Sequence, residues 1–316
     1  MATYKEIRGI NIQSLEEDPY AVEGGVWYNS TTGLLKVHAS SATWTTGNDY
    51  NVGRSGKSGG GTQAAAWIAS GNDDPAYFQH TEFYDGTTWT EVNNPGENHN
   101  QTAGGGTQAA AWMATGTPGD ATSAEEFDGT NWANSNSCNT GNAQRASCGP
   151  QTAAMMIGAE PQTVAVESYD GTNWTEVADY PVALSGMESV GTNTANITFG
   201  GYASSSYRTE ANTYDGSSFT AVADMNSGTS EMAKAGENSN SAMKMGGQPG
   251  TTANTEVWDG TSWTEVANLP QADVQGEGAG TTSATTWASG KDSAGNYPVK
   301  SAEWTVAVAV ETVAFD

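Results

Sequence analysis

The sequence has few basic residues, few cysteines and no long apolar run. Only 11 Lys and Arg stand against 36 Asp and Glu, which gives the 316 residues a formal net charge of −25. Binding to nucleic acid or to an anionic membrane surface is therefore not expected, because both require a basic surface. No apolar run approaches the ~20 residues that span a bilayer, and the N-terminal segment lacks the apolar centre of a secretory signal. We expect an acidic protein without membrane insertion or a signal peptide.

The cysteine content excludes a disulfide framework. The chain has two cysteines, Cys138 and Cys148. Either they form one bridge or they remain two reduced thiols, and the sequence favours the second arrangement without deciding it.

One short pattern, an aromatic residue followed by Asp-Gly, a small polar pair and a second aromatic, recurs along the chain. Its first copy is "EFYDGTTWTEV" at 82–92, and the five copies contain Asp85, Asp128, Asp170, Asp215 and Asp259. Asp-Gly between two runs of strand formers predicts a β-hairpin, because Gly accepts positive φ and Asp hydrogen-bonds within its own turn. We therefore assign these carboxylates to turns and not to a metal site.

The spacing of these hairpins predicts a repeat architecture. The second aromatic falls at Trp89, Trp132, Trp174, Phe219 and Trp263, with steps of 43, 42, 45 and 44 residues. No segment keeps a 3.6-residue apolar stripe, which excludes helical repeats. Four short strands in each repeat of this length are typical of a β-propeller blade, with the Gly- and Ala-rich strand innermost. The predicted fold class is all-β, a kelch-like propeller of about six four-stranded blades.

The last repeat lacks the Asp-Gly turn and ends in "KSAEWTVAVAVETVAFD" at 300–316. Trp44 lies one repeat length before Trp89 with no complete blade in front of it. We predict that 43–46 closes the last blade as its fourth strand. The expected domains are an N-terminal docking segment with a β-hairpin, 1–42, and the propeller, 43–316. A ring of seven blades that includes 1–46 is the alternative.

The repeats resemble kelch repeats in "FGGY" at 199–202 and "MGGQ" at 245–248, each followed by a strand and a Trp or Phe strand, although most units keep a single Gly. The whole chain more specifically resembles the kelch-like propeller proteins encoded among the virion genes of marine tailed bacteriophages. The opening "MATYKEIRGINIQ", the hairpin "EGGVWYNSTTGLLKV" at 23–37, the "GGGTQAAAW" strands and the "EEFDGTNW" hairpins bear that likeness. The resemblance implies a virion structural or tail-associated role, without known catalysis, in a protein made in the host cytoplasm.

No catalytic or cofactor motif stands out. "RSGKSGGG" at 54–61 is similar to a phosphate-binding loop, but Asn51 replaces a required Gly and a strand, not a helix, is expected to follow. The three histidines and two cysteines do not suggest a copper site, and no carboxylate pair is singled out for glycoside hydrolysis. We therefore expect a non-enzymatic protein with no cofactor and no metal.

The loops that join the second and third strands, and those that join one blade to the next, share one face of a propeller and vary between the repeats. We predict a binding face there, since functional variation belongs on loops held by a rigid scaffold. The candidate residues are Tyr77, Phe78, His80, Tyr180, Tyr202, Tyr207, Arg208 and Tyr297. The expected partners are other virion or tail proteins through residues 1–40, in several copies per particle, and a host glycan or receptor on the loop face. A lectin-like or glycan-active propeller is the alternative function.

Overall fold

The computed structural model describes residues 12–19, 25–119 and 121–313 and divides the chain into two compact units. Unit 1 comprises Met1–Thr43 and Thr305–Asp316, and unit 2 comprises Trp44–Trp304. The sequence-based division assigned 305–316 to the propeller, whereas these residues group with the N-terminal segment. Every regular element in the described ranges is a β-strand, and no helix suited to crossing a membrane occurs among them.

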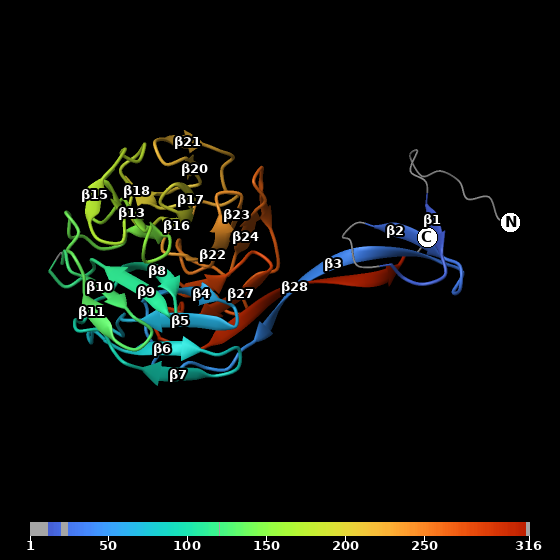
Figure 1. Cartoon of the computed structure of the whole chain (residues 1–316), viewed down its shortest axis with the longest axis horizontal. Coiled ribbons are helices and arrows are strands. Elements are labelled where there is room, and N and C mark those ends of the chain that lie inside the picture. The colour runs from blue at the N-terminus through green and yellow to red at the C-terminus, as the bar shows by residue number, and fades with distance from the viewer. Residues whose placement is uncertain (1–11, 20–24, 120, 314–316) are drawn as a thin grey trace. The chain divides into compact units, whose positions relative to one another are not determined.

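The strands of unit 2 form antiparallel sheets, which gives the chain a β-propeller-like, all-β fold (Figure 1). Sheets A to E have four strands each, and sheet F has six strands. Sheet A contains β4 (Ser58–Thr62), β5 (Ala65–Ala69), β6 (Thr81–Tyr84) and β7 (Trp89–Val92), and sheet B contains β8 (Ala103–Thr107), β9 (Ala110–Ala114), β10 (Ala124–Phe127) and β11 (Trp132–Asn134). Sheet C contains β12 (Ala146–Cys148), β13 (Met155–Ile157), β14 (Val166–Tyr169) and β15 (Trp174–Glu176), and sheet D contains β16 (Glu188–Thr192), β17 (Ala195–Phe199), β20 (Ala211–Tyr214) and β21 (Phe219–Ala221). The hairpin β18 (Tyr202–Ala203) and β19 (Ser206–Tyr207) is inserted in sheet D, and sheet E contains β22 (Ala233–Asn238), β23 (Ser241–Met245), β24 (Thr255–Trp258) and β25 (Trp263–Glu265).

The first strands of sheets A to E, and β26 (Glu277–Gly280) of sheet F, surround the centre of unit 2, as their small residues predict (Figure 1). Between sheets A and B, and between sheets B and C, the first strands approach so closely at one glycine each that a side chain does not fit there. A Cβ atom on Gly60 would stand 2.9 Å from the carbonyl oxygen of Gly106, and one on Gly105 would stand 2.8 Å from that of Gly149. Glycine is therefore required here by the close approach of backbones and not by loop flexibility.

Aromatic residues of the fourth strands pack against the neighbouring sheet. The Trp132 ring lies 5.9 Å from Trp67 of sheet A, and the Trp174 ring lies 5.6 Å from Trp112 of sheet B. The Trp263 ring lies 5.0 Å from Phe199 of sheet D. Tilted and edge-on aromatic pairs of this kind bury a large area and fix the orientation of adjacent sheets.

The Asp-Gly hairpins form as the sequence predicts. Asp85 Oδ1 accepts hydrogen bonds from the backbone N–H groups of Thr87 and Thr88, at 2.8 and 2.7 Å, and Gly86 has φ +87°. These backbone donors lower the pKa of the Asp85 carboxyl. The other four Asp-Gly carboxylates, those of Asp128, Asp170, Asp215 and Asp259, accept the same pair of backbone donors. Turn chemistry therefore occupies all five carboxylates.

A buried carboxylate recurs at the second residue of the third strand in several sheets. Glu82 in sheet A pairs with Arg54 at 2.7 Å, Glu167 in sheet C pairs with Arg145 at 2.8 Å, and Glu256 in sheet E pairs with Lys244 at 3.3 Å. All six side chains have 0% exposure. Each pair is buried in its own sheet. The glutamate also accepts a hydrogen bond from a backbone N–H of the loop that precedes the sheet.

Both cysteines are buried free thiols, so the reduced alternative is the one that the structure has. Burial raises the pKa of each thiol to about 11.

Sheet F has six strands in the order β1-β2-β3-β28-β27-β26. Its strands are β1 (Gln13–Leu15), β2 (Val26–Asn29), β3 (Leu34–Thr46), β26 (Glu277–Gly280), β27 (Ala284–Ala288) and β28 (Ser301–Thr312). The two long strands, β3 and β28, each contribute residues to both units.

Unit 1 contains the predicted N-terminal hairpin, in which β2 and β3 pair with Val26 opposite Val37. Asp18 holds the hairpin from one side, since its carboxylate accepts hydrogen bonds from Trp27 Nε1 at 3.1 Å and Asn29 Nδ2 at 2.8 Å.

Candidate functional site

The segments that lead into the first strands meet in a ring at one end of the central channel. Within this ring the backbone N–H of each member donates to the backbone carbonyl of the preceding member, at 2.6 to 3.2 Å. The N–H of the first member, Gly56, donates to the carbonyl of the last, Gln275, which closes the cycle. The members are Gly56, Gln101, Gln144, Gly186, Glu231 and Gln275, and all six have positive φ, between 53° and 63°. This set is called the mouth ring below. It fixes the backbone around the channel entrance.

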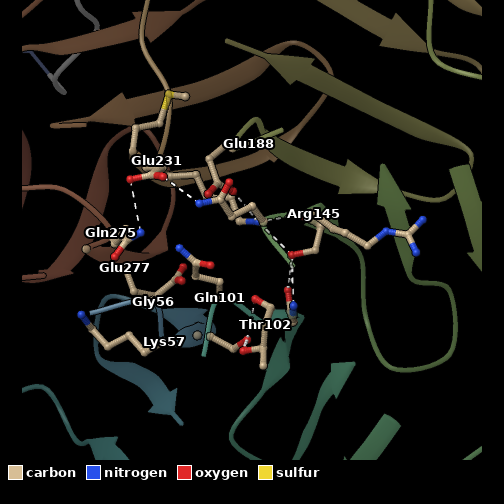
Figure 2. Close-up of a pocket in the computed structure, with 18 of the residues that line it drawn as sticks. Gly56, Lys57, Gln101, Thr102, Arg145, Glu188, Glu231, Gln275 and Glu277 are labelled. Atoms are coloured by element: carbon tan, nitrogen blue, oxygen red, sulfur yellow. Dashed lines mark hydrogen bonds and ion pairs between the residues drawn. The ribbon is translucent and has the colours of Figure 1, made fainter. Parts of the chain in front are cut away.

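The side chains of the mouth ring bond to one another at the entrance (Figure 2). Gln144 Nε2 donates to Glu231 Oε1 at 2.8 Å, and Gln275 Nε2 donates to Glu231 Oε2 at 3.2 Å. Burial raises the pKa of the Glu231 carboxyl, although the two amides act against that rise. The carboxylate of Glu231 is thus held as a hydrogen-bond acceptor by two amides.

Below the mouth ring the channel contains two more carboxylates and one ammonium group. Lys234 Nζ pairs with Glu188 Oε2 at 2.9 Å and donates to the Ser147 hydroxyl at 3.2 Å. Glu277 lies beside them, and burial raises the pKa of its carboxyl to about 7 against the opposing charge of Lys234. The charged ends of Lys57 and Arg145 point away from the channel (Figure 2). This part of the channel encloses about 70 Å³, enough for a few waters at the ~10–15 Å³ each requires, but not for a sugar.

A larger hollow of about 370 Å³ lies on the same face, between the mouth ring and the β18–β19 hairpin. It is called the tyrosine groove. Tyr202 and Tyr207, opposite each other in the hairpin with ring centroids 5.1 Å apart, form its aromatic side. Its polar lining consists of Gln144, Glu160, Gln162, Ser185, Ser230, Glu231 and Gln248.

The polar lining of the tyrosine groove is organised by internal hydrogen bonds. Glu160 Oε2 accepts from Gln162 Nε2 at 2.7 Å and from the Ser185 hydroxyl at 3.0 Å. The groove therefore presents an aromatic pair on one side and fixed acceptors and amides on the other, which is the composition of a site for a small polar ligand.

The predicted binding residues are spread over several sheets. Tyr202 and Tyr207 line the tyrosine groove, and Arg208 pairs with Glu210 beside them. On sheet A, Tyr77 is 37% exposed, the Phe78 ring lies 5.7 Å from His80, and His80 pairs with Glu91 at 2.8 Å. Tyr297 lies in a separate hollow with Asp73, Asp74 and Lys291. Only the residues of sheet D therefore combine into one site.

Tyr180 requires a correction, because it is not on the binding surface. Its side chain is 2% exposed, its hydroxyl accepts a hydrogen bond from Asn212 Nδ2 at 2.9 Å, and its ring lies 5.0 Å from Phe219. Its loop folds over the sheet edge, so the ring enters the core between sheets C and D. Sequence position alone placed this residue in a variable loop, and packing decided its direction.

Glutamine side chains recur just after the Gly-rich first strands of sheets A to C. Gln108 Nε2 donates to the carbonyls of Ala66 and Tyr84 in sheet A, both at 2.8 Å. Gln151 does the same to Ala111 and Phe127 of sheet B, at 3.0 and 3.1 Å. These amides therefore tie each sheet to the preceding one.

One cluster in sheet B contains the residue types of a catalytic triad, namely Ser123, His99 and Glu97. Both the Ser123 hydroxyl and the Glu97 carboxylate lie on the same ring nitrogen, His99 Nε2, at 3.1 and 2.9 Å. In a triad the serine and the carboxylate occupy opposite ring nitrogens. This arrangement therefore cannot pass a proton from serine to histidine with carboxylate support. Within the described ranges no group of three or more His, Cys, Asp or Glu side chains is placed to hold a metal ion.

The residues that sequence reasoning missed are those of the mouth ring and the polar side of the tyrosine groove. A repeat-by-repeat comparison of the residues just before each Gly-rich strand would have aligned Gln101, Gln144, Glu231 and Gln275 at one position. Glu160 and Gln162 come from the loop between β13 and β14 of sheet C, and Gln248 comes from the loop between β23 and β24 of sheet E.

Comparisons with known proteins support the fold and nothing finer. No family model matches the chain, and no curated protein sequence matches it. Among solved structures, one titled "Structure of YjhT" is similar with a TM-score of 0.65 at 12% sequence identity, covering 83% of this chain and 99% of that chain. At this identity the likeness is one of fold alone, an all-β, propeller-like arrangement of sheets.

Proposed function

We propose that unit 2 is a closed propeller of six blades and that Trp44–Thr46 of β3 forms the outer strand of the last blade. The closed cycle of six backbone hydrogen bonds through the mouth ring supports this count. The place of β3 next to β28, the Gly47 N–H donating to the Ser301 carbonyl at 3.0 Å, and the Trp44 ring 5.4 Å from Trp304 support the closure.

The closure is tested by removing its strand. A chain that begins at residue 47 should unfold at a clearly lower temperature than the full chain, because β28 would lose its outer neighbour and Trp304 its aromatic partner. An unchanged thermal midpoint would contradict the closure, and a seventh sheet in an experimental structure would contradict the count.

We propose that the protein is a non-enzymatic virion component whose propeller presents a binding face and whose N-terminal segment docks onto the particle. The tyrosine groove carries this proposal, since two predicted binding residues and organised polar groups combine in it. The resemblance of residues 1–40 to phage propeller proteins supports the virion role. Residues 1–11 and 20–24 of the docking segment lie outside the described ranges.

The chemistry of the tyrosine groove favours a neutral, polyhydroxylated ligand, such as a terminal sugar of a surface glycan. Tyr202 and Tyr207 offer ring faces for stacking, while Glu160 and Glu231 are acceptors already held in place by amides and a hydroxyl. A sugar supplies the apolar face and the hydroxyl donors that such a groove requires. The chain's charge of −25 disfavours an anionic ligand.

The glycan-active alternative and the non-enzymatic proposal share this groove and differ in turnover. Glycan-array screening followed by calorimetry should identify a bound sugar, and Tyr202→Ala and Tyr207→Ala should each weaken binding by roughly tenfold, the loss of one aromatic anchor. Tyr77→Ala, which removes an exposed tyrosine outside the groove, is the matched control. Release of sugar from any bound polysaccharide would overturn the non-enzymatic assignment. Locating the chain in a particle reconstruction tests the virion role separately.

A further inference from the structure

The C-terminal part of β28 is an unguarded sheet edge in unit 1. Its sequence from Thr305 to Thr312 is TVAVAVET, with Glu311 as its single ionisable residue and neither Lys nor Pro. Val308 and Val310 are each 39% exposed. Natural sheets usually protect an edge of this length with Lys, Pro, a bulge or a covering segment, because an open edge pairs with other strands.

One side of this segment lacks a described neighbour. β28 lies between β3 and β27 in the sheet order. The Ser289 N–H donates to the Lys300 carbonyl at 2.8 Å, and counting back along the antiparallel pair sets the five residues of β27 opposite 301–305. From Val306 to Thr312, β3 is therefore the one neighbour that the described residues supply.

The hydrogen-bond register shows which backbone groups face the open side. The Val313 N–H donates to the Leu35 carbonyl of β3 at 3.0 Å. In an antiparallel strand the N–H and C=O of one residue point to the same side, and the side alternates along the chain. The open edge therefore presents the N–H and C=O groups of Val306, Val308 and Val310.

The apolar side chains of this edge gather on one face. Lys36 Nζ donates to the Thr312 hydroxyl at 2.9 Å, so these two side chains share a face of the β3–β28 pair. Because side chains alternate, Leu34 of β3 and Val308 and Val310 of β28 lie on the same face. Leu34 is 42% exposed. A strand added at the edge would extend this apolar face and cover part of it.

We propose that the segment Val306–Thr312 of β28 pairs with the same segment of a second copy of this chain, antiparallel and centred on Ala309, to form a continuous sheet. This inference concerns unit 1 and does not depend on the ligand proposed for the tyrosine groove.

The charge pattern selects a second copy and this register. Centring on Ala309 places Val308 of each copy opposite Val310 of the other, so valine lies opposite valine across the new pair. Glu311 of each copy then lies opposite Ala307 of the other, and the two carboxylates stay at opposite ends of the pairing. A self-complementary edge of this kind produces a closed dimer about a two-fold axis.

The expected dimer is weak and salt-dependent. An eight-residue edge buries less than the standard of about 800 Å² per partner. Two chains of charge −25 also repel each other over a distance that salt shortens. Sedimentation velocity from micromolar to near-millimolar concentration should therefore show a monomer–dimer equilibrium that shifts toward the dimer as salt is raised.

The decisive variant is Val308→Pro, which removes an outward N–H and leaves the bonds to β3 in place. It should weaken the dimer roughly tenfold or more, since the symmetric pair loses two hydrogen bonds, one on each strand. Hydrogen exchange of the β3 amides should be unchanged, which shows that unit 1 remains folded. Val182→Lys, at an exposed valine of equal exposure (39%) in unit 2, should leave association unchanged, whereas Val308→Lys should abolish it.

Cross-linking tests the register. Cys138 and Cys148 are buried, so Ala309→Cys, at the position that lies opposite itself in the proposed pair, introduces the one exposed thiol of the described chain and should form a disulfide-linked dimer under mild oxidation. Val182→Cys, at the same concentration, should not. A wild-type chain that stays monomeric at near-millimolar concentration and high salt, or a dimer that Val308→Pro does not weaken, would overturn the proposal.

Discussion

Sheets A and B place a buried glutamate at the same point, the second residue of the third strand, and surround it differently. In sheet A, Glu82 pairs with Arg54 and also accepts hydrogen bonds from the N–H and the side-chain amide of Asn51. In sheet B, Glu125 accepts one bond from the Gly96 N–H at 2.7 Å, and its Oε2 has no partner among the described residues. His99 precedes the mouth-ring residue Gln101 by two positions, just as Arg54 precedes Gly56. Its Nε2, however, pairs with Glu97 and not with Glu125.

This difference shows how a repeated fold tolerates a buried acid in two ways. Burial raises the pKa of Glu125, and the nearby Glu97 adds to the rise while His99 opposes it. In sheet E burial acts on Glu256 too, but hydrogen bonds from Ser227 and Asn226 and the charge of Lys244 overcome it, so its pKa is lowered. An internal cation keeps the carboxylate charged, whereas without one a proton neutralises it more readily.

The largest effect is expected from breaking the pair in sheet A. Arg54→Met should lower the free energy of unfolding by about 3–5 kcal/mol, because Glu82 would remain buried without its cation. Urea denaturation of the full chain, monitored by tryptophan fluorescence, measures this loss of unfolding free energy. Lys300→Met removes a cation from the exposed pair with Asp49, whose side chains are 51% and 45% exposed, and should cost about 1 kcal/mol or less. Equal losses for the two variants would contradict the comparison.

A smaller loss is expected when both members of the pair are removed. Arg54→Met combined with Glu82→Gln should recover part of the stability lost by Arg54→Met alone, since no unpaired charge stays buried. The glutamine can still accept the Asn51 donors. A double-mutant cycle in urea gives the coupling, and additive losses would show that Glu82 does not depend on Arg54.

The smallest change at neutral pH is expected in sheet B. Glu125→Gln should alter the free energy of unfolding by about 1 kcal/mol or less, because the amide oxygen keeps the Gly96 hydrogen bond and no cation loses its partner. Glu167→Gln in sheet C is the matched control, since it leaves the Arg145 guanidinium buried without a carboxylate and should cost several-fold more.

The pH dependence of Glu125→Gln sharpens the same point. Because the folded pKa of Glu125 is raised, its contribution to stability is full below the unfolded pKa and is lost as the pH rises through the folded value. The stability of the wild type relative to Glu125→Gln should therefore fall between the ordinary glutamate pKa and that raised value. Thermal midpoints of both proteins, measured from acidic to neutral pH, check this. A difference that rises with pH would mean that Glu125 is charged and stabilised in the folded state.

The sequence by itself determined the all-β class, the strands and the Asp-Gly turns. These depend on local chemistry, since Asp85 bonds to backbone groups two and three residues away and Gly86 accepts positive φ. It also indicated the small inner strands, because one period repeats the same residues at the same points. The sequence likewise placed Tyr202 and Tyr207 on a variable loop, where they line the tyrosine groove.

Tertiary structure alone decided which repeated positions are equivalent in chemistry. Arg54 and Arg145 reach the same glutamate position from different points of their loops, so no alignment of repeats pairs them. Tyr180 turned into the core, and Glu160 and Gln162 from one loop met Gln248 from another in one groove. The physical reason is the same throughout. Strands and turns follow from neighbours in the chain, whereas the direction of a long side chain follows from the space and the partners that other sheets leave for it.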